Sequence, residues 1–464
     1  MGNDLSEKQS WRSQSKVILA LATPAIIENF FQTIIGFVDT YFLSKVGLDE
    51  VTAVGLTNAI ILVYFAIFMS IGVAANIFIA KYRGANEHEN AKKVAQQSIF
   101  LACFTGLIFG IFTLVFSSPI LKLMGAEGNV LTLGTVYFNI VAIPSILISL
   151  MFVLSSIIRG TGDTKTPMKV SIWINILHIL LDYIFIFGFL FIPSMGIIGA
   201  AIATVIVRLV GVLLLWRFLG NSELKIRILD KNCWMPNKTI QLQLLTMGGP
   251  AAGERLVMRL GQVLYFGFII QLGTNTFAAH QIAGSIEVFS YMIGYGLATA
   301  ATILIAQHIG ANEYDKAKQV GTTVTILSIF IMTILGSFLF FFAEWLGQLF
   351  TNDPDVIRDI RIALQIDAFI QPILAIVLVL TGVFQGGGNT KYPMYITTIG
   401  IWVIRTVGVY VLGISLGFGI AGVWIAIGLD NAFRAWLLWR KFSKDQWIQF
   451  QQKDGISRKT TISS

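Results

Sequence analysis

Residues 160–168 read GTGDTKTPM, and residues 386–394 read GGGNTKYPM, nearly the same string 226 positions later. The string Gly-Ala-Asn-Glu at residues 84–87 also returns at residues 310–313, with the same offset. Two unrelated strings that recur at one spacing indicate an internal duplication with almost no gaps. The sequence therefore predicts two copies of one structural unit, each a little over 220 residues long.

The segments between these strings are strongly apolar. The chain has 464 residues, of which 55% are hydrophobic and only 12% charged. Residues 51–80, 94–121 and 128–158 contain no Asp, Glu, Lys or Arg. Each of these stretches exceeds the roughly 20 residues that cross a bilayer as a helix. We therefore expect an all-α polytopic membrane protein, which excludes a soluble enzyme, a secreted disulfide scaffold, a disordered regulator and an outer-membrane barrel.

The apolar stretches number twelve, six in each copy of the repeat, so both copies have the same orientation in the membrane. We predict an N-terminal six-helix lobe over residues 1–217, an inter-lobe cytoplasmic loop over 218–239, and a C-terminal six-helix lobe with a cytoplasmic tail over 240–464. The predicted spans are 17–43, 51–80, 94–118, 131–158, 168–191, 196–217, 240–270, 277–306, 320–349, 357–384, 392–414 and 418–439.

Basic residues are distributed unevenly between the predicted loops. With the N-terminus inside, 24 of the 33 Lys and Arg residues lie on the cytoplasmic side and four lie outside. Because cytoplasmic loops carry the excess of Lys and Arg, both termini are expected in the cytoplasm of a cell-membrane protein. The net charge of +8 is thus a topology signal, and we expect the lipid bilayer, not nucleic acid, as its partner.

A parallel repeat of six and six helices favours transport. Two pseudo-symmetric bundles around a central cleft can expose one site to either side of the membrane in turn, which is alternating access. A membrane enzyme would need a paired catalytic constellation near the membrane surface, and the sequence offers none. We therefore predict a transporter and not an enzyme, with a pure channel as a weaker alternative.

Two acids stand out within the predicted spans. Asp39 shares a helix face with Gln32 and Gly36, next to Phe37, and no basic residue lies within one turn of it inside the span. In the fifth span, Asn175, His178 and Asp182 extend a polar stripe that begins at Ser171. An ionisable group at this depth costs about 2.5–3.5 kcal/mol on insertion scales, so it is expected to face protein or a water-filled cavity.

The duplication indicates that Asp39 and Asp182 serve function and not architecture. At the offset of 226, Tyr265 takes the place of Asp39, and Gly408 takes the place of Asp182. We therefore predict that both acids serve one functional cavity in the N-terminal lobe. Burial and a second nearby acid favour the protonated carboxyl, so the site can exchange a proton for a cationic substrate. His178 is a candidate relay or a hydrogen-bond partner.

Other charges within the spans have structural explanations. Asp430 and Arg434 are four residues apart and can pair on one helix face. Glu28 and Glu254 occupy equivalent places in the two copies, which favours an architectural or gating role. Three arginines, Arg208, Arg405 and Arg434, are too few and too scattered to indicate a site for an anionic headgroup.

The combined pattern resembles the multidrug and toxic compound extrusion (MATE) family. The resemblance rests on Pro24, which recurs as Pro250, on the string Gly36-Phe37-Val38-Asp39-Thr40, on the loop that begins at Arg159, and on the two halves of six spans. It covers nearly the whole chain and is strongest to the DinF-like branch. The family implies two lobes around a V-shaped cleft and export of amphipathic or cationic compounds in exchange for protons or sodium ions.

The resemblance also implies which residues form the site. Its N-lobe acids correspond to Asp39 and Asp182, and the acids of its C-lobe sodium site correspond to Met258 and Leu374, which cannot bind a cation. We therefore expect proton coupling through Asp39 and Asp182, with Gln32, Gly36, Phe37, Asn175 and His178 around the substrate. No cofactor or bound metal is expected, and the chain is expected to act as a monomer. The alternatives are sodium coupling and a lipid or lipid-linked oligosaccharide flippase.

Overall fold

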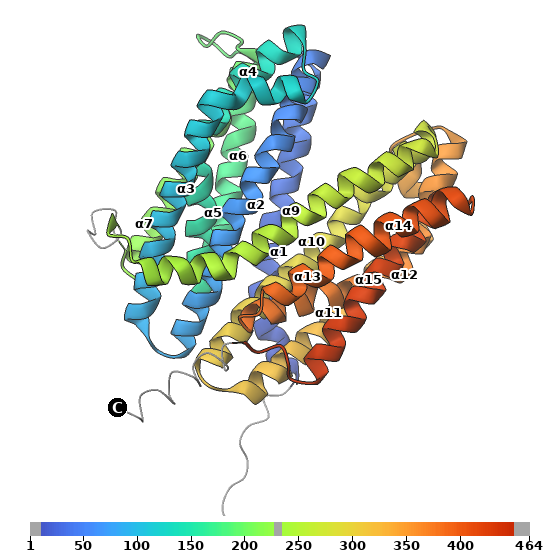
Figure 1. The fold of residues 1–464 in the computed structure, drawn as a ribbon. Coiled ribbons are helices and arrows are strands. Elements are labelled where there is room, and N and C mark those ends of the chain that lie inside the picture. Colours follow the sequence, from blue (N-terminus) through green and yellow to red (C-terminus); the bar gives the residue numbers. More distant parts are fainter. Residues whose placement is uncertain (1–10, 227–233, 450–464) are drawn as a thin grey trace, which may run out of the picture. The chain divides into compact units, whose positions relative to one another are not determined.

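A computed structural model describes residues 11–226 and 234–449, and nearly all of them are helical (Figure 1). The first half contains α1 (Trp11–Ser44), α2 (Leu48–Gly84), α3 (His88–Leu123), α4 (Gly128–Ala142), α5 (Ser145–Gly160), α6 (Lys165–Phe187) and α7 (Gly196–Asn221). The second half contains α9 (Lys238–Gln271), α10 (Thr274–Gly310), α11 (Tyr314–Gln348), α12 (Pro354–Gly386), α13 (Lys391–Ile399), η1 (Gly400–Arg405), α14 (Thr406–Gly408), η2 (Val409–Ser415) and α15 (Gly419–Ser443).

The all-helical prediction is confirmed, and each predicted span coincides with a helix or a run of joined helices. Within the described residues, nine helices are long and apolar enough to cross a membrane, or ten if α4 and α5 count as one span. Helices α9 and α15 fall outside this count, and both contain charged residues in their middle turns, such as Arg255 and Asp430.

The predicted uninterrupted span 131–158 is wrong. Helix α4 ends at Ala142, α5 begins at Ser145, and the two are bent by 47°. Pro144 lies at the break and cannot donate a backbone hydrogen bond, so a regular helix cannot continue through it. Gly106 and Gly110 of α3 face the backbone of this break so closely that an added Cβ would collide with it.

The duplication is visible in the helix boundaries. Helices α2 and α10 each have 37 residues, and both ends of α10 lie 226 positions after those of α2. The turns that follow are also alike, because Asn86 (φ 58°) and Asn312 (φ 61°) both adopt the left-handed conformation. Asparagine tolerates that conformation better than other residues with a Cβ, which explains why the Gly-Ala-Asn-Glu string serves both turns.

Replacing either asparagine with valine is expected to strain its turn. We expect Asn86→Val and Asn312→Val each to lower the stability by about 1–2 kcal/mol, because a branched Cβ crowds the left-handed backbone. Thermal unfolding of the purified protein in detergent measures the effect. The matched controls Asn86→Gly and Asn312→Gly are expected to stay close to wild type, and equal losses in valine and glycine variants would contradict this explanation.

The described chain packs as two compact units whose boundaries differ from the predicted ones. One unit is Ile27–Ala252, and the other combines the residues up to Ile26 with those from Gly253 onward. The boundaries therefore fall inside α1 and α9, two residues after Pro24 and Pro250, and not in the loop 218–239. Residues 227–233 of that loop, and residues 450–464 of the predicted cytoplasmic tail, lie outside the described residues.

Side-chain contacts explain this division. Gln14 of α1 accepts a hydrogen bond from Thr323 of α11 (3.0 Å), within the unit that contains the later helices. In the same way, Gln241 of α9 donates to Gln97 of α3 (3.3 Å), within the Ile27–Ala252 unit. The first part of each of these two helices thus packs with the opposite copy of the repeat.

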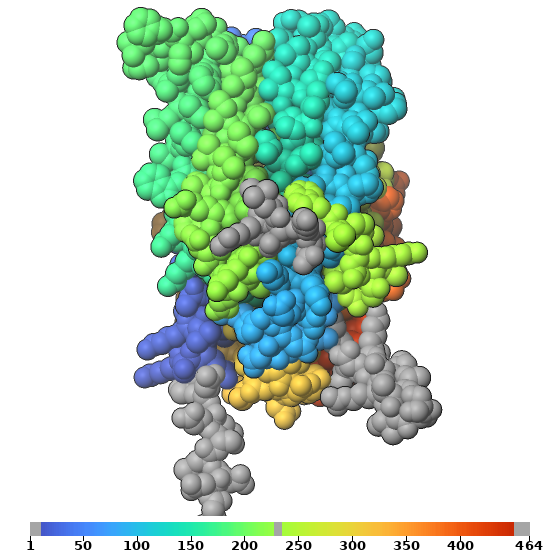
Figure 2. All heavy atoms as spheres, turned by 90° about the vertical axis from the view of Figure 1, so that its left-hand side faces the viewer, coloured from blue at the N-terminus to red at the C-terminus, as the bar shows by residue number. Residues whose placement is uncertain are grey.

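Each unit has its own core. In the Ile27–Ala252 unit, buried Tyr64 packs on Phe109 and Phe138, and its hydroxyl pairs with that of Thr113 (2.9 Å). Figure 2 shows one face of this unit, on which the green helices α6 and α7 and the cyan helices α3 and α4 lie. Exposed apolar side chains such as Phe104 of α3 suit contact with lipid.

Candidate functional site

Helix α6 buries the predicted polar stripe. Ser171, Asn175, His178 and Asp182 are all at most 8% exposed, although they belong to an otherwise apolar helix. Their spacing of three and four residues places them on one helix face. The stripe therefore faces protein, as predicted, and Asp182 is its most deeply buried member at 1% exposure.

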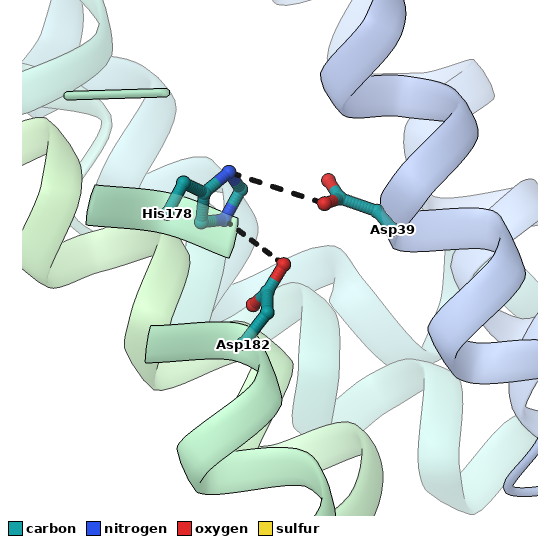
Figure 3. Close-up of side chains that lie close together, drawn as sticks. All are labelled: Asp39, His178 and Asp182. Atoms are coloured by element: carbon teal, nitrogen blue, oxygen red, sulfur yellow. Dashed lines mark ion pairs between the residues drawn. The ribbon is translucent and has the colours of Figure 1, made fainter. Parts of the chain in front are cut away.

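Helix α1 brings the second acid to this stripe, within the Ile27–Ala252 unit. The imidazole of His178 lies between two carboxyl groups, with Nδ1 4.0 Å from Asp39 Oδ1 and Nε2 3.6 Å from Asp182 Oδ2 (Figure 3). The ligand atoms of all three side chains lie within 4.8 Å of one another. The structure thus brings together both acids and the histidine.

The carboxyl groups of this site are poorly satisfied. Neither oxygen of Asp182 has a hydrogen-bond partner within the described part of the chain, and the same holds for Asp39 Oδ1. A buried ionised carboxyl without partners is strongly disfavoured, so such a group takes up a proton or a cation. The Asp39 side chain is 31% exposed, which gives the site a side that is open to exchange.

Two neighbouring helices contribute residues that the sequence analysis did not assign to the site. Thr204 of α7 places its hydroxyl 3.3 Å from His178 Nε2 and donates to the carbonyl of Ala200 (2.9 Å). Tyr137 of α4 and Arg208 of α7 lie within electrostatic range of Asp39, and Arg208 also donates to the carbonyl of Val141 (3.0 Å). Thr204 and Arg208 are four residues apart, so a polar face on α7 was the available signal.

The remaining predicted cavity residues are less closely associated with the acids. Asn175 donates to the Ser171 hydroxyl (3.4 Å), along its own helix. Gln32, Gly36 and Phe37 are exposed on α1, with Phe37 at 54%. Their contribution to a substrate cavity stays a prediction.

Glu28 has a partner that explains its burial. Its carboxylate accepts a charge-assisted hydrogen bond from Arg159 (2.8 Å), at the end of α5. The sequence analysis did not pair Arg159 with Glu28. This ion pair ties α1 to α5 in the Ile27–Ala252 unit and supports the architectural interpretation of Glu28.

The corresponding place in the other unit is occupied by an ion-pair network. Tyr265, the repeat equivalent of Asp39, lies under the guanidinium of Arg405 (5.7 Å to the ring centre). Arg405 pairs with Asp430 (2.7 Å), and Arg434 pairs with the same carboxylate (2.9 Å). The predicted Asp430–Arg434 pair is confirmed, and Asp430, which is fully buried, is neutralised by two arginines from its own unit.

Two segments of the chain match the MatE family model, residues 24–184 and residues 250–411. The chain belongs to the MatE family. The two matched segments begin 226 residues apart, so the family model recognises each copy of the duplication separately. This family comprises transporters and not enzymes, and the MatE chain is a multi-pass membrane protein.

Individual relatives match this chain over almost its full length. The MatE chain is 32% identical to the probable multidrug resistance protein NorM of Thermotoga maritima and covers 93% of both chains. It is 28% identical to the uncharacterized transporter YisQ of Bacillus subtilis, over 93% of this chain and 95% of YisQ. These matches confirm the family and support multidrug efflux, whereas the DinF-like branch stays a prediction.

Solved structures share the fold. The transporter superposes with a TM-score of 0.86, at 25% identity, on an outward-facing multidrug resistance MATE family transporter of the MOP superfamily, covering 93% of this chain and 96% of that one. A structure of MATE in the bent conformation superposes with a TM-score of 0.87 at 24% identity and likewise covers 93% of this chain. The predicted fold of two pseudo-symmetric lobes is confirmed, and the central cleft stays a prediction.

Proposed function

We propose that this MatE transporter is a multidrug exporter in which protons taken up at Asp39, His178 and Asp182 drive the exit of amphipathic, cationic compounds by alternating access. The single observation that carries the proposal is the imidazole between two poorly satisfied carboxyl groups in one unit. Protonated His178 can donate to both acids, whereas neutral His178 can donate to only one.

Proton uptake changes the charge of the site. With both acids ionised and His178 neutral, the site carries two negative charges near the single positive charge of Arg208. A cationic substrate and a proton then compete for the same surplus negative charge. Binding of the proton removes the attraction for the substrate and changes the preferred packing of α1 against α6, which is the physical basis of antiport.

The donor atoms favour a proton over a sodium ion. Hard cations are bound by oxygen ligands, and an imidazole nitrogen is a poor substitute. The ligand atoms of His178 and both acids lie within 4.8 Å of one another, so an ion that bound both acids would also meet an imidazole nitrogen. A sodium-coupled exporter is the second candidate, because the three ligand atoms are close enough together to surround one cation.

The expected setting of the protein follows from its charge distribution. We place the transporter in the cell membrane with both termini in the cytoplasm, because 24 of the 33 Lys and Arg residues fall on that side of the helices. Substrate is then taken up on the cytoplasmic side and released outside. Membership in the DinF-like branch and function as a monomer belong to the same proposal.

Transport in sealed liposomes tests the proposal. We expect a fluorescent cationic dye to move when a pH gradient is imposed and not when an equal sodium gradient is imposed. Asp39→Asn is expected to abolish the response to the pH gradient, because the amide cannot take up or release the proton. The matched control is Asp49→Asn, an exposed acid on α2 that accepts a hydrogen bond from Asn129.

The possible outcomes separate the candidates. Dye movement driven by sodium alone would keep the exporter and replace the proton with a sodium ion. Transport by Asp39→Asn at the wild-type rate against a proton gradient would contradict the proposed role of that acid. If no dye moved under either gradient, the assay would be repeated with labelled lipids to test a flippase.

A further inference from the structure

The unit that contains the later helices buries a second acid, distinct from the ion-pair network. Asp367 of α12 is fully buried, and its Oδ2 accepts a hydrogen bond from the Gln371 amide (2.6 Å). Its Oδ1 has no partner, and neither has Gln371 Oε1, within the parts of the chain that the structure describes. Gln371 is also fully buried, so water at the surface does not complete either group.

The surroundings of Asp367 offer no positive charge. Its neighbours on the same helix include buried Ile370 and Leu374, and Leu374 packs with Met332 of α11. Among the described residues, no basic side chain lies within ion-pair distance of Asp367. This contrasts with Asp430, which has two arginines. An ionised carboxylate in such a place has no compensation for its lost hydration.

Several charged groups lie on the helices that pack on α12. On α10, Glu287 lies within electrostatic range of Asp367, as well as of Arg405. On α15, Asp430 and Arg434 satisfy each other together with Arg405. Other charged side chains lie near the ends of α11 and α13 and do not neutralise Asp367. They are Asp315, Lys316, Lys318, Glu344 and Lys391. His280 of α10 does not neutralise it either, because its ring contacts Tyr265, Phe266 and Trp424.

Glu287 of α10 is the acid that lies within electrostatic range of Asp367. Its side chain is only partly buried, and it belongs to α10, which packs closely on α12. Glu287 is therefore the acidic side chain on a packed helix through which a proton at Asp367 could exchange.

We propose that Asp367 is a second proton-binding site of the transporter and that Glu287 exchanges its proton with solvent. The acids are absent from the first copy of the repeat, where Val141 and Ile61 stand at the equivalent positions. They also differ from the positions of Met258 and Leu374, where the family resemblance places the C-lobe sodium ligands. Protonation of Asp367 does not depend on proton coupling by Asp39 and Asp182.

Infrared spectroscopy tests this site without requiring transport. The probe is the carbonyl stretch of protonated carboxyl groups, recorded for the full-length protein in lipid before and after exchange from H₂O to D₂O. The background variant Asp39→Asn/Asp182→Asn removes the carboxyl groups of the first site. In that background we expect a deuterium-sensitive carboxyl band, which is lost when Asp367→Asn is added.

Further variants separate the roles of the two acids. Glu287→Gln is expected to retain the Asp367 band and to slow its exchange with D₂O. Asp367→Glu keeps a carboxyl group, so it is expected to shift the band without removing it, and it serves if Asp367→Asn does not fold. Glu344→Gln is the matched control, because this exposed acid pairs with Arg361 at the helix ends (3.2 Å).

The decisive results are distinct from those of the dye experiment. Persistence of the band after Asp367→Asn would overturn the second site, and unchanged exchange in Glu287→Gln would overturn the route through that residue. Loss of the band on Asp367→Asn in a protein that moves dye only with sodium would establish the second site while rejecting proton coupling at the first.

Discussion

Asp182→Asn is expected to uncouple export from the proton gradient almost completely. The substitution keeps the size of the side chain but fixes the site in a state without this negative charge. An ionised group at this depth costs about 2.5–3.5 kcal/mol relative to water on insertion scales, which corresponds to roughly a hundredfold in an equilibrium. We therefore expect proton-driven dye transport by the reconstituted variant to fall by about that factor.

The reason lies in the burial of this acid. Asp182 is 1% exposed, whereas the Asp39 side chain is 31% exposed, so the charge of Asp182 is the harder one to hydrate. The ionised form of Asp182 therefore needs a nearby positive charge more than the ionised form of Asp39 does. Proton release measured with a pH indicator, when substrate is added to purified protein in weak buffer, is expected to be lost in parallel with transport.

Asp163→Asn is the matched control for this prediction. Asp163 lies in the loop before α6 and accepts hydrogen bonds from the backbone of Lys165 (3.1 Å) and Thr166 (3.0 Å), at the start of that helix. Its repeat equivalent is already an asparagine, Asn389, which accepts from the backbone of Tyr392 (3.2 Å). The control should therefore transport like wild type. Wild-type proton release by folded Asp182→Asn would exclude this acid from coupling.

Asp430→Asn is expected to cause the largest loss of stability. Asp430 is fully buried and compensates both Arg405 and Arg434, so its removal leaves two guanidinium groups without their carboxylate. Breaking a buried ion pair by removing one partner costs about 3–5 kcal/mol. We expect a marked fall in the thermal unfolding temperature in detergent, together with low recovery of folded protein.

The comparison with an exposed ion pair makes this prediction specific. Glu344 and Arg361 are about half exposed and lie 3.2 Å apart, and exposed pairs contribute about 0–1 kcal/mol. Arg361→Gln is therefore expected to unfold close to the wild-type temperature. A double variant in which Arg405 and Asp430 become Gln and Asn should lose less than the sum of the single variants. Additive losses would show that the two residues do not stabilise each other.

Much of the architecture could be predicted because it depends on local pattern. Long apolar stretches, three of them free of charged residues, identify the spans, and the offset of 226 predicts both the equal lengths of α2 and α10 and the matching turns. The meeting of Asp39 with His178 and Asp182 was anticipated from polar periodicity and from the absence of both acids in the second copy. These features require no knowledge of which helices touch.

The missed features depend on tertiary packing. Thr204 and Tyr137 reach the site from α7 and α4, and no spacing within one helix reveals such neighbours. The pairing of Arg405 with Asp430 was not predicted, because Asp430 lies on another helix, 25 residues later. The π-helical turns of η1, whose Ile401 carbonyl accepts a hydrogen bond from the hydroxyl of Thr406 in α14, were also not predicted.

The exchange of helix segments between the units has a consequence for synthesis of the protein. The Ile27–Ala252 unit needs the first part of α9, so its packing cannot be completed until residues beyond the loop 218–239 have left the ribosome. Conversely, Trp11–Ile26 enters the membrane first, yet the helices it packs with are made last. Expression of the first six spans alone should therefore yield a degradation-prone fragment, and a nascent chain arrested before Lys238 would depend on chaperones or the insertion machinery to shield its unfilled surface.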